Sequence, residues 1–84
     1  MRINGIDLAP FSRMQRKLLV QLGLSTPRIV SIGELIEHCY PDPDIEPDSA
    51  EECIRCRIRD IRCRLHGWTV IGVWGRGYIL ERTQ

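Results

Sequence analysis

Apolar residues recur every three or four positions in three stretches of the chain, the spacing of a helix with one buried face. These stretches predict helices over residues 13–22, 32–39 and 50–65. Gly23 and Gly67 follow the first and third helices and are expected to stop them. The positions expected to face the core are Met14, Leu18, Leu19 and Leu22, then Ile32, Leu35, Ile36 and Cys39, and finally Ile54, Ile58, Ile61 and Leu65.

Each predicted helix begins with a serine that is followed three residues later by Gln or Glu. This is the capping-box pattern, in which the two side chains satisfy each other's free backbone N–H groups. Prolines after residue 40 end the second helix and stiffen the loop that follows it. The three expected boxes are Ser12–Gln15, Ser31–Glu34 and Ser49–Glu52.

After Gly67 the pattern changes to that of β-strands. Residues 68–74 are rich in β-branched and aromatic side chains, Gly75-Arg-Gly77 is a turn, and strand character resumes at Tyr78, so we expect a hairpin over about 68–82. Residues 2–8 alternate weakly around Asn4-Gly5 and predict a short N-terminal strand or hairpin. The expected fold is therefore α+β: a winged helix-turn-helix with three helices, a C-terminal β-hairpin wing and a short N-terminal strand.

Length and composition agree with one such domain spanning residues 1–84. The chain is 43% apolar and 27% charged, which is ordinary for a globular domain. Its longest apolar runs, 17–24 and 68–74, fall well short of the roughly 18 residues of a membrane span. The first residues lack the apolar segment of a secretory signal, so we expect a cytoplasmic protein whose four cysteines are reduced.

The net charge is only +1, but the charges are segregated along the chain. Residues 1–33 carry a balance of +4, residues 34–52 a balance of −8, and residues 53–84 a balance of +5, and eleven of the twelve basic residues are Arg. Arginine suits bidentate contacts to phosphate and guanine. The pattern indicates a basic contact face and a separate acidic surface; plain solvated surface charge is the alternative.

The third predicted helix carries five arginines away from its apolar stripe. Like charges at this spacing repel, and a polyanion relieves the repulsion while releasing counterions. The major groove of DNA admits one helix, and small side chains between the arginines allow a close approach. Opposite the core we expect Cys53, Cys56, Asp60 and Cys63, flanked by Arg57 and Arg64 on one side and by Arg55, Arg59 and Arg62 on the other.

The hairpin tip supplies a second candidate contact. Arg76 lies between two glycines and is expected to reach a phosphate or a minor groove. Trp74 is expected either to pack on the sugar-phosphate backbone or to cap the core, and Trp68 and Tyr78 are assigned to the core or its rim.

Over residues 11–80 the chain resembles the OmpR/PhoB-type winged-helix effector domain of bacterial response regulators. Residues 11–22 are similar to the family pattern Leu-Thr-Pro-x-Glu-x-x-Leu-Leu-x-x-Leu, and residues 28–36 to Arg-Val-Val-Ser-Arg-Glu-Glu-Leu-Leu. Residues 53–65 resemble the recognition helix Thr-Val-Asp-Val-His-Ile-Arg-Arg-Leu-Arg-x-x-Leu, and residues 73–80 the wing signature Val-Arg-Gly-x-Gly-Tyr-x-Leu. The last two motifs are the more specific.

The resemblance implies a DNA-binding transcription regulator with its third helix in the major groove of double-stranded DNA. In the family the loop before this helix contacts RNA polymerase; here that loop contains Asp42, Asp44, Glu46 and Asp48. The DNA-facing positions of the family fall on Cys53, Cys56, Arg57, Arg59, Asp60, Arg62 and Arg76, and we add Arg55 and Trp74 from the helix face and the wing.

The chain departs from the family pattern in three ways. We expect no receiver domain before the helices, the N-terminal sheet is reduced to residues 2–8 at most, and Asp60 stands where the family has a base-reading Arg. A carboxylate repels phosphate, although it accepts a hydrogen bond from a cytosine amino group. The sequence leaves three properties open: the operator, whether the protein activates or represses transcription, and whether it binds DNA as a homodimer.

Two other functions compete with DNA binding. Asp60 and the near-zero net charge favour a protein-interaction module that docks on the transcription machinery. Cys53-x-x-Cys56 with Cys63 suggests a metal or redox sensor, but one helix supplies a nearly linear row where zinc requires a tetrahedron. No P-loop, nucleophile elbow or dinucleotide motif is present, so we expect no enzyme activity, no cofactor and no metal.

Overall fold

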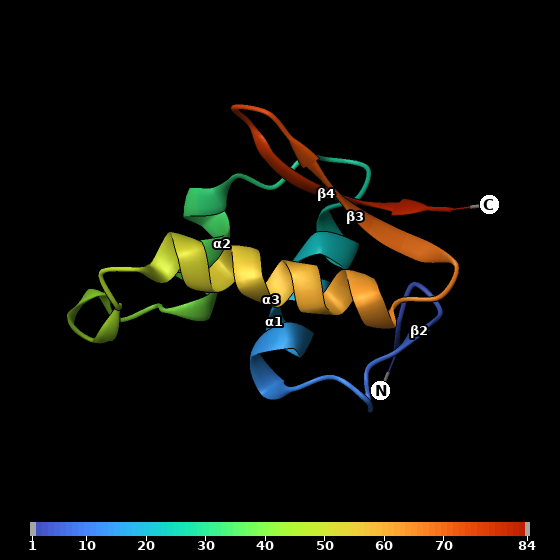
Figure 1. Cartoon of the computed structure of the whole chain (residues 1–84), viewed down its shortest axis with the longest axis horizontal. Helices are drawn as coiled ribbons and strands as arrows, with labels where there is room; N and C mark the ends of the chain where they lie inside the picture. The colour runs from blue at the N-terminus through green and yellow to red at the C-terminus, as the bar shows by residue number, and fades with distance from the viewer. Residues whose placement is uncertain (1, 84) are drawn as a thin grey trace.

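The computed structural model describes residues 2–83, apart from the side chain of Pro43. Three helices are followed by a C-terminal antiparallel hairpin and preceded by a short strand pair, the α+β layout expected of a winged helix (Figure 1). In chain order the elements are β1 (Arg2–Ile3), β2 (Ile6–Asp7), α1 (Arg13–Ser25), α2 (Ile32–Cys39), a 3-10 turn η1 (Pro43–Ile45), α3 (Ala50–Arg64), β3 (Trp68–Val73) and β4 (Gly77–Arg82).

The core lies where the three helices meet the inner face of the β3–β4 hairpin. The apolar stripes predicted from the sequence supply most of it, because each stripe can leave water only by packing on the others. Met14, Ile32, Ile36 and Leu65 pack at its margin, as do Trp68 and Tyr78. The buried members are Ile6, Leu8, Phe11, Leu18, Leu19, Leu22, Val30, Leu35, Cys39, Ile54, Ile58, Ile61, Val70 and Leu80.

The predicted end of the first helix was wrong. Helix α1 continues through Gly23 to Ser25, and Gly23 is buried inside it. A Cβ atom at this position would lie 2.6 Å from Cγ1 of Ile3, and Asn4 Nδ2 donates to the Gly23 carbonyl at 3.1 Å. Gly23 therefore allows the N-terminal β1–β2 hairpin to approach the helix, and it does not act as a stop signal.

The three expected capping boxes have three different outcomes. At α1 the box is complete, since Gln15 N donates to Ser12 Oγ and Ser12 N donates to Gln15 Oε1. At α2 only the serine half forms, because the carboxylate of Glu34 pairs with Arg28 at 3.2 Å instead. At α3 the expectation was wrong.

The α3 box fails because Ser49 does not have the backbone conformation of a capping residue. Its φ of −98° and ψ of 28° lie away from the extended region, and its side chain makes no cap hydrogen bond. Its Oγ lies 3.9 Å from Cys53 Sγ, one turn along the chain.

One residue of the segment between α1 and α2 pairs with β4 as a third strand would. Val30 exchanges both backbone hydrogen bonds with Tyr78, at 2.8 and 2.9 Å. Gly77 has φ of 143°, and a Cβ atom there would overlap the Val30 carbonyl, so this approach requires glycine. Strand β4 thus lies between Val30 and β3, and β3 has one unpaired edge.

In Figure 1 the hairpin leaves the C-terminal end of α3 and runs back above that helix. Its tip reaches the side of the molecule that carries α2. Within residues 2–83, no helix has both the length and the apolar character needed to cross a bilayer.

Candidate nucleic-acid interface

Helix α3 buries its isoleucines and exposes the opposite face. Ile54, Ile58 and Ile61 are almost completely buried, as the sequence predicted. With 100° between successive residues, the middle of the exposed face falls opposite this stripe. It carries Glu52, Cys56, Arg59, Asp60 and Cys63, all exposed.

Arg59 is thus the one arginine of α3 at the centre of the exposed face, and it shares this centre with two carboxylates. The other four lie on the flanks: Arg55 and Arg62 on one side, Arg57 and Arg64 on the other. All five remain exposed, so the arginine surface is not buried by the fold. Its positive charge is concentrated along the two sides of the helix.

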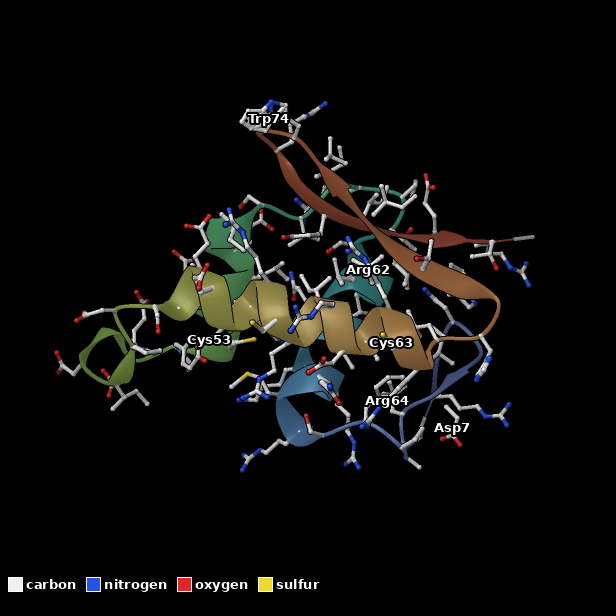
Figure 2. All side chains as sticks on the ribbon, in the orientation of Figure 1. Asp7, Cys53, Arg62, Cys63, Arg64 and Trp74 are labelled. Atoms are coloured by element: carbon white, nitrogen blue, oxygen red, sulfur yellow. The ribbon has the colours of Figure 1, made fainter. Side chains whose placement is uncertain are left out.

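Arg62 is directed at the wing, as Figure 2 shows. Its Nε donates to the Val70 carbonyl at 2.6 Å. Tyr78 and Leu80 use backbone groups on the side of β4 away from β3, bonding Val30 and the Thr26 hydroxyl. The opposing residues of β3 therefore turn their own carbonyls toward the unpaired edge, where Arg62 satisfies one of them.

Arg64 points the opposite way, toward the N-terminal segment (Figure 2). Its Nη1 donates to the Pro10 carbonyl at 3.2 Å. On the first turns of the helix Arg55 pairs with Glu51 at 2.9 Å. Among the residues described, Arg57 and Arg59 have no hydrogen bond or ion pair, which leaves both available for a ligand.

The tip of the wing places a large aromatic side chain in solvent. Trp74 is 92% exposed and projects away from the helices (Figure 2), so of the two expected alternatives the one in which it caps the core is wrong. Arg76 is exposed beside it, in a turn where Gly75 has φ of 73°. Trp68 is half-buried at the other end of β3, with the Arg82 guanidinium 5.4 Å from its ring centre.

A groove of about 580 Å³ separates this tip from the helices. Sequence reasoning did not find it, because its walls come from three distant segments. One wall was detectable in the sequence, because Glu51 and Arg55 have the i,i+4 spacing of an ion pair on a helix. The lining residues are Ser31, Ile32, Glu51, Arg55 and residues 72–78.

The cysteines do not form one row. Cys39 is buried, and this burial raises the pKa of its thiol above the ordinary value of 9.0, although Lys17 and Arg57 partly oppose the shift. Cys53 was expected on the exposed face but is half-buried, because it turns toward Tyr40. Burial also raises the pKa of Tyr40.

Cys56 and Cys63 are exposed, and all four cysteines are free thiols. Within the described part of the chain, no three side chains of the His, Cys, Asp or Glu types converge as a metal centre requires.

The acidic loop lies beyond the N-terminal end of α3 (Figure 1). Asp42, Asp44, Glu46 and Asp48 are all exposed, and Ile45 among them is 69% exposed. The loop turns at Asp42, whose carboxylate accepts from Asp44 N at 3.0 Å. It therefore presents a compact negative surface separate from the arginines.

No family model matches this chain, and no curated protein matches it closely enough to indicate a relative.

Proposed function

We propose that this protein is a double-stranded DNA-binding transcription regulator of the OmpR/PhoB-like winged-helix type. Helix α3 enters the major groove, and the wing lies on the backbone or the minor groove. The function needs no catalytic residue, metal or cofactor. It places the protein in the bacterial cytoplasm, as the product of either a bacterial or a phage gene.

The observation that carries the proposal is the pairing of α3 with a wing tip that has no role in the core. A side chain as large as Trp74 that is 92% exposed contributes nothing to the packing of this fold. It lies beside Arg76, and the groove joins this tip to the arginine-bearing flank of α3. Apolar and cationic side chains together are what a wing needs to contact sugar and phosphate.

Within the exposed face of α3 we assign the roles by position. Arg59, Asp60 and Cys56 lie where a helix in the major groove meets base edges, and Arg57 lies on a flank where phosphates pass. Arg62 is held by Val70 through Nε only, so its remaining donors stay available to a phosphate.

The test is the affinity for duplex DNA as a function of salt. Fragments selected by the protein from genomic DNA supply the binding site, and anisotropy titrations measure the affinity. We expect the logarithm of affinity to fall linearly with that of salt, and Arg59→Ala and Arg76→Ala each to weaken binding. Unchanged affinity and salt slope in both variants would overturn the placement of α3 and the wing.

A protein-interaction module is the second candidate, and the two carboxylates at the centre of the α3 face favour it. Glu52, Arg59 and Asp60 all lie on that centre, and their charges sum to −1. The acidic loop offers a further surface for RNA polymerase. Pull-down from lysate with and without nuclease separates the candidates: a partner retained after nuclease treatment favours the protein module, and one that is lost favours DNA.

A further inference from the structure

The groove beneath the wing tip contains an arginine whose present partner is an exposed carboxylate. Arg55 Nη2 lies 2.9 Å from Glu51 Oε1, one helical turn away. The side chains are 57% and 52% exposed, so water competes with the pair and its strength is modest. The pair is a single contact, from Nη2 to Oε1, so an anion that offers two oxygens to the guanidinium can replace it at little cost.

The opposite wall of the groove is the wing tip. It contributes Arg76 and Trp74, so the groove is lined by an arginine from each wall and by an aromatic residue of the wing. A strand of nucleic acid carries an anionic phosphate next to an apolar sugar face, and the two walls complement these parts. A volume of about 580 Å³ accommodates such a segment.

We propose that this groove binds a phosphodiester of one DNA strand, and that the phosphate displaces the carboxylate of Glu51 from Arg55. Glu51 then acts as an internal competitor that lowers the affinity of the wing side of the interface. This inference rests on the proposed function and adds to it a site and a residue that opposes binding.

The chain offers a matched control for this competition. Glu52 lies on the same first turn of α3 and is exposed, and no ion pair to it occurs among the described residues. Glu51→Gln and Glu52→Gln therefore remove the same charge from the same turn, with the same loss of favourable interaction with the helix dipole. Glu52 also lies at the centre of the exposed face, where its carboxylate opposes DNA independently of Arg55. Only Glu51→Gln releases Arg55, so only its effect should depend on whether Arg55 is present.

The experiment measures duplex affinity for wild type, both glutamine variants, Arg55→Ala, and each glutamine substitution combined with Arg55→Ala. Circular dichroism and thermal unfolding establish that each is folded. We expect the gain in affinity from Glu51→Gln to be about two- to fivefold larger with Arg55 present than in the Arg55→Ala background, the factor set by an exposed ion pair. We expect Arg55→Ala to weaken binding and to reduce the salt slope by about one. Glu52→Gln should give the same gain in both backgrounds.

A gain from Glu51→Gln that is equally large with and without Arg55 would overturn the displacement. Wild-type protein that binds no duplex would instead overturn the proposed function itself. Titration with inorganic phosphate at fixed ionic strength, followed by tryptophan fluorescence, distinguishes a DNA phosphodiester from free phosphate as the ligand of the groove. Saturable binding of free phosphate at micromolar concentration would point to a small anion and overturn the assignment to a DNA strand.

Discussion

The guanidinium of Arg62 donates to the carbonyl oxygen of Val70 at 2.6 Å and so joins α3 to the unpaired edge of the wing. The neighbouring Arg59 has no such partner among the described residues and faces solvent. Two arginines of one helix, three positions apart, thus have different roles. One holds the wing against the helix, and the other is available to a ligand.

This difference predicts unequal effects of two alanine substitutions on the free energy of unfolding. Arg62→Ala should lower the free energy of unfolding by about 1 kcal/mol, the usual net value of one hydrogen bond, whereas Arg59→Ala should change it by less than about 0.5 kcal/mol. Chemical denaturation measures both. Equal stabilities of the two variants would show that the contact with Val70 does not hold the wing. In duplex titrations, Arg59→Ala should retain a native thermal transition and still lose affinity.

Trp74 is expected to matter for binding and not for folding. Trp74→Ala should leave the melting temperature unchanged, because the side chain is 92% exposed. It should weaken duplex binding by less than the ~1–3 kcal/mol that stacking of a base on an aromatic side chain contributes, because a contact to the sugar buries less surface. In the wild type, DNA should alter the emission of the exposed tryptophan. A fluorescence change of the same size in Trp74→Ala would assign the signal to Trp68 and contradict the wing contact.

The two glycines of the turn should tolerate alanine differently. Gly75 has φ of 73° in open space, so Gly75→Ala costs only the left-handed conformation, about 1 kcal/mol. Gly77 has φ of 143° and lies against the Val30 carbonyl, so Gly77→Ala adds a backbone clash and should cost at least about 2 kcal/mol. Equilibrium unfolding compares them, and equal losses would show that Val30 is not fixed beside β4.

Burial of Cys39 predicts a loss of stability at alkaline pH. The folded state raises the pKa of this thiol above 9.0, so it binds the proton more tightly than the unfolded state does. The resulting stability is complete below pH 9 and is lost as the pH rises through the folded pKa. Denaturation between pH 7 and 11 should show this decline.

Cys39→Ala should reduce the alkaline decline at a cost of about 1 kcal/mol at neutral pH. Cys63→Ala, at an exposed thiol, is the matched control and should leave the decline intact. Tyr40, whose pKa is also raised by burial, accounts for the part that persists above pH 10 in both variants. An unchanged pH profile in Cys39→Ala would contradict the role of the buried thiol.

Local pattern was sufficient to predict the elements and most of the core. The helices, the hairpin, the isoleucine stripe of α3 and the complete capping box at Ser12 follow from spacing along one segment. A helix buries whichever face is apolar, and a Gly-Arg-Gly turn between β-rich runs folds back on itself. Predictions failed for different reasons: Ile3, from a distant segment, packs on Gly23 inside α1, and Arg28, six residues away, pairs with the carboxylate of Glu34 in place of its box. At Ser49 the backbone conformation itself prevents the cap.

Some features of the candidate site also follow from local pattern, whereas others depend on the tertiary structure. Sequence alone determined that α3 exposes arginines and that the wing carries Trp74 and Arg76, because periodicity and turn residues report which side chains leave the core. Only the tertiary structure decided that Arg62 and Arg64 are held by distant carbonyls, that Arg55 faces a groove, and that Trp74 projects into solvent. Each of these depends on two segments meeting in space, and the periodicity of one segment carries no information about what another brings to it.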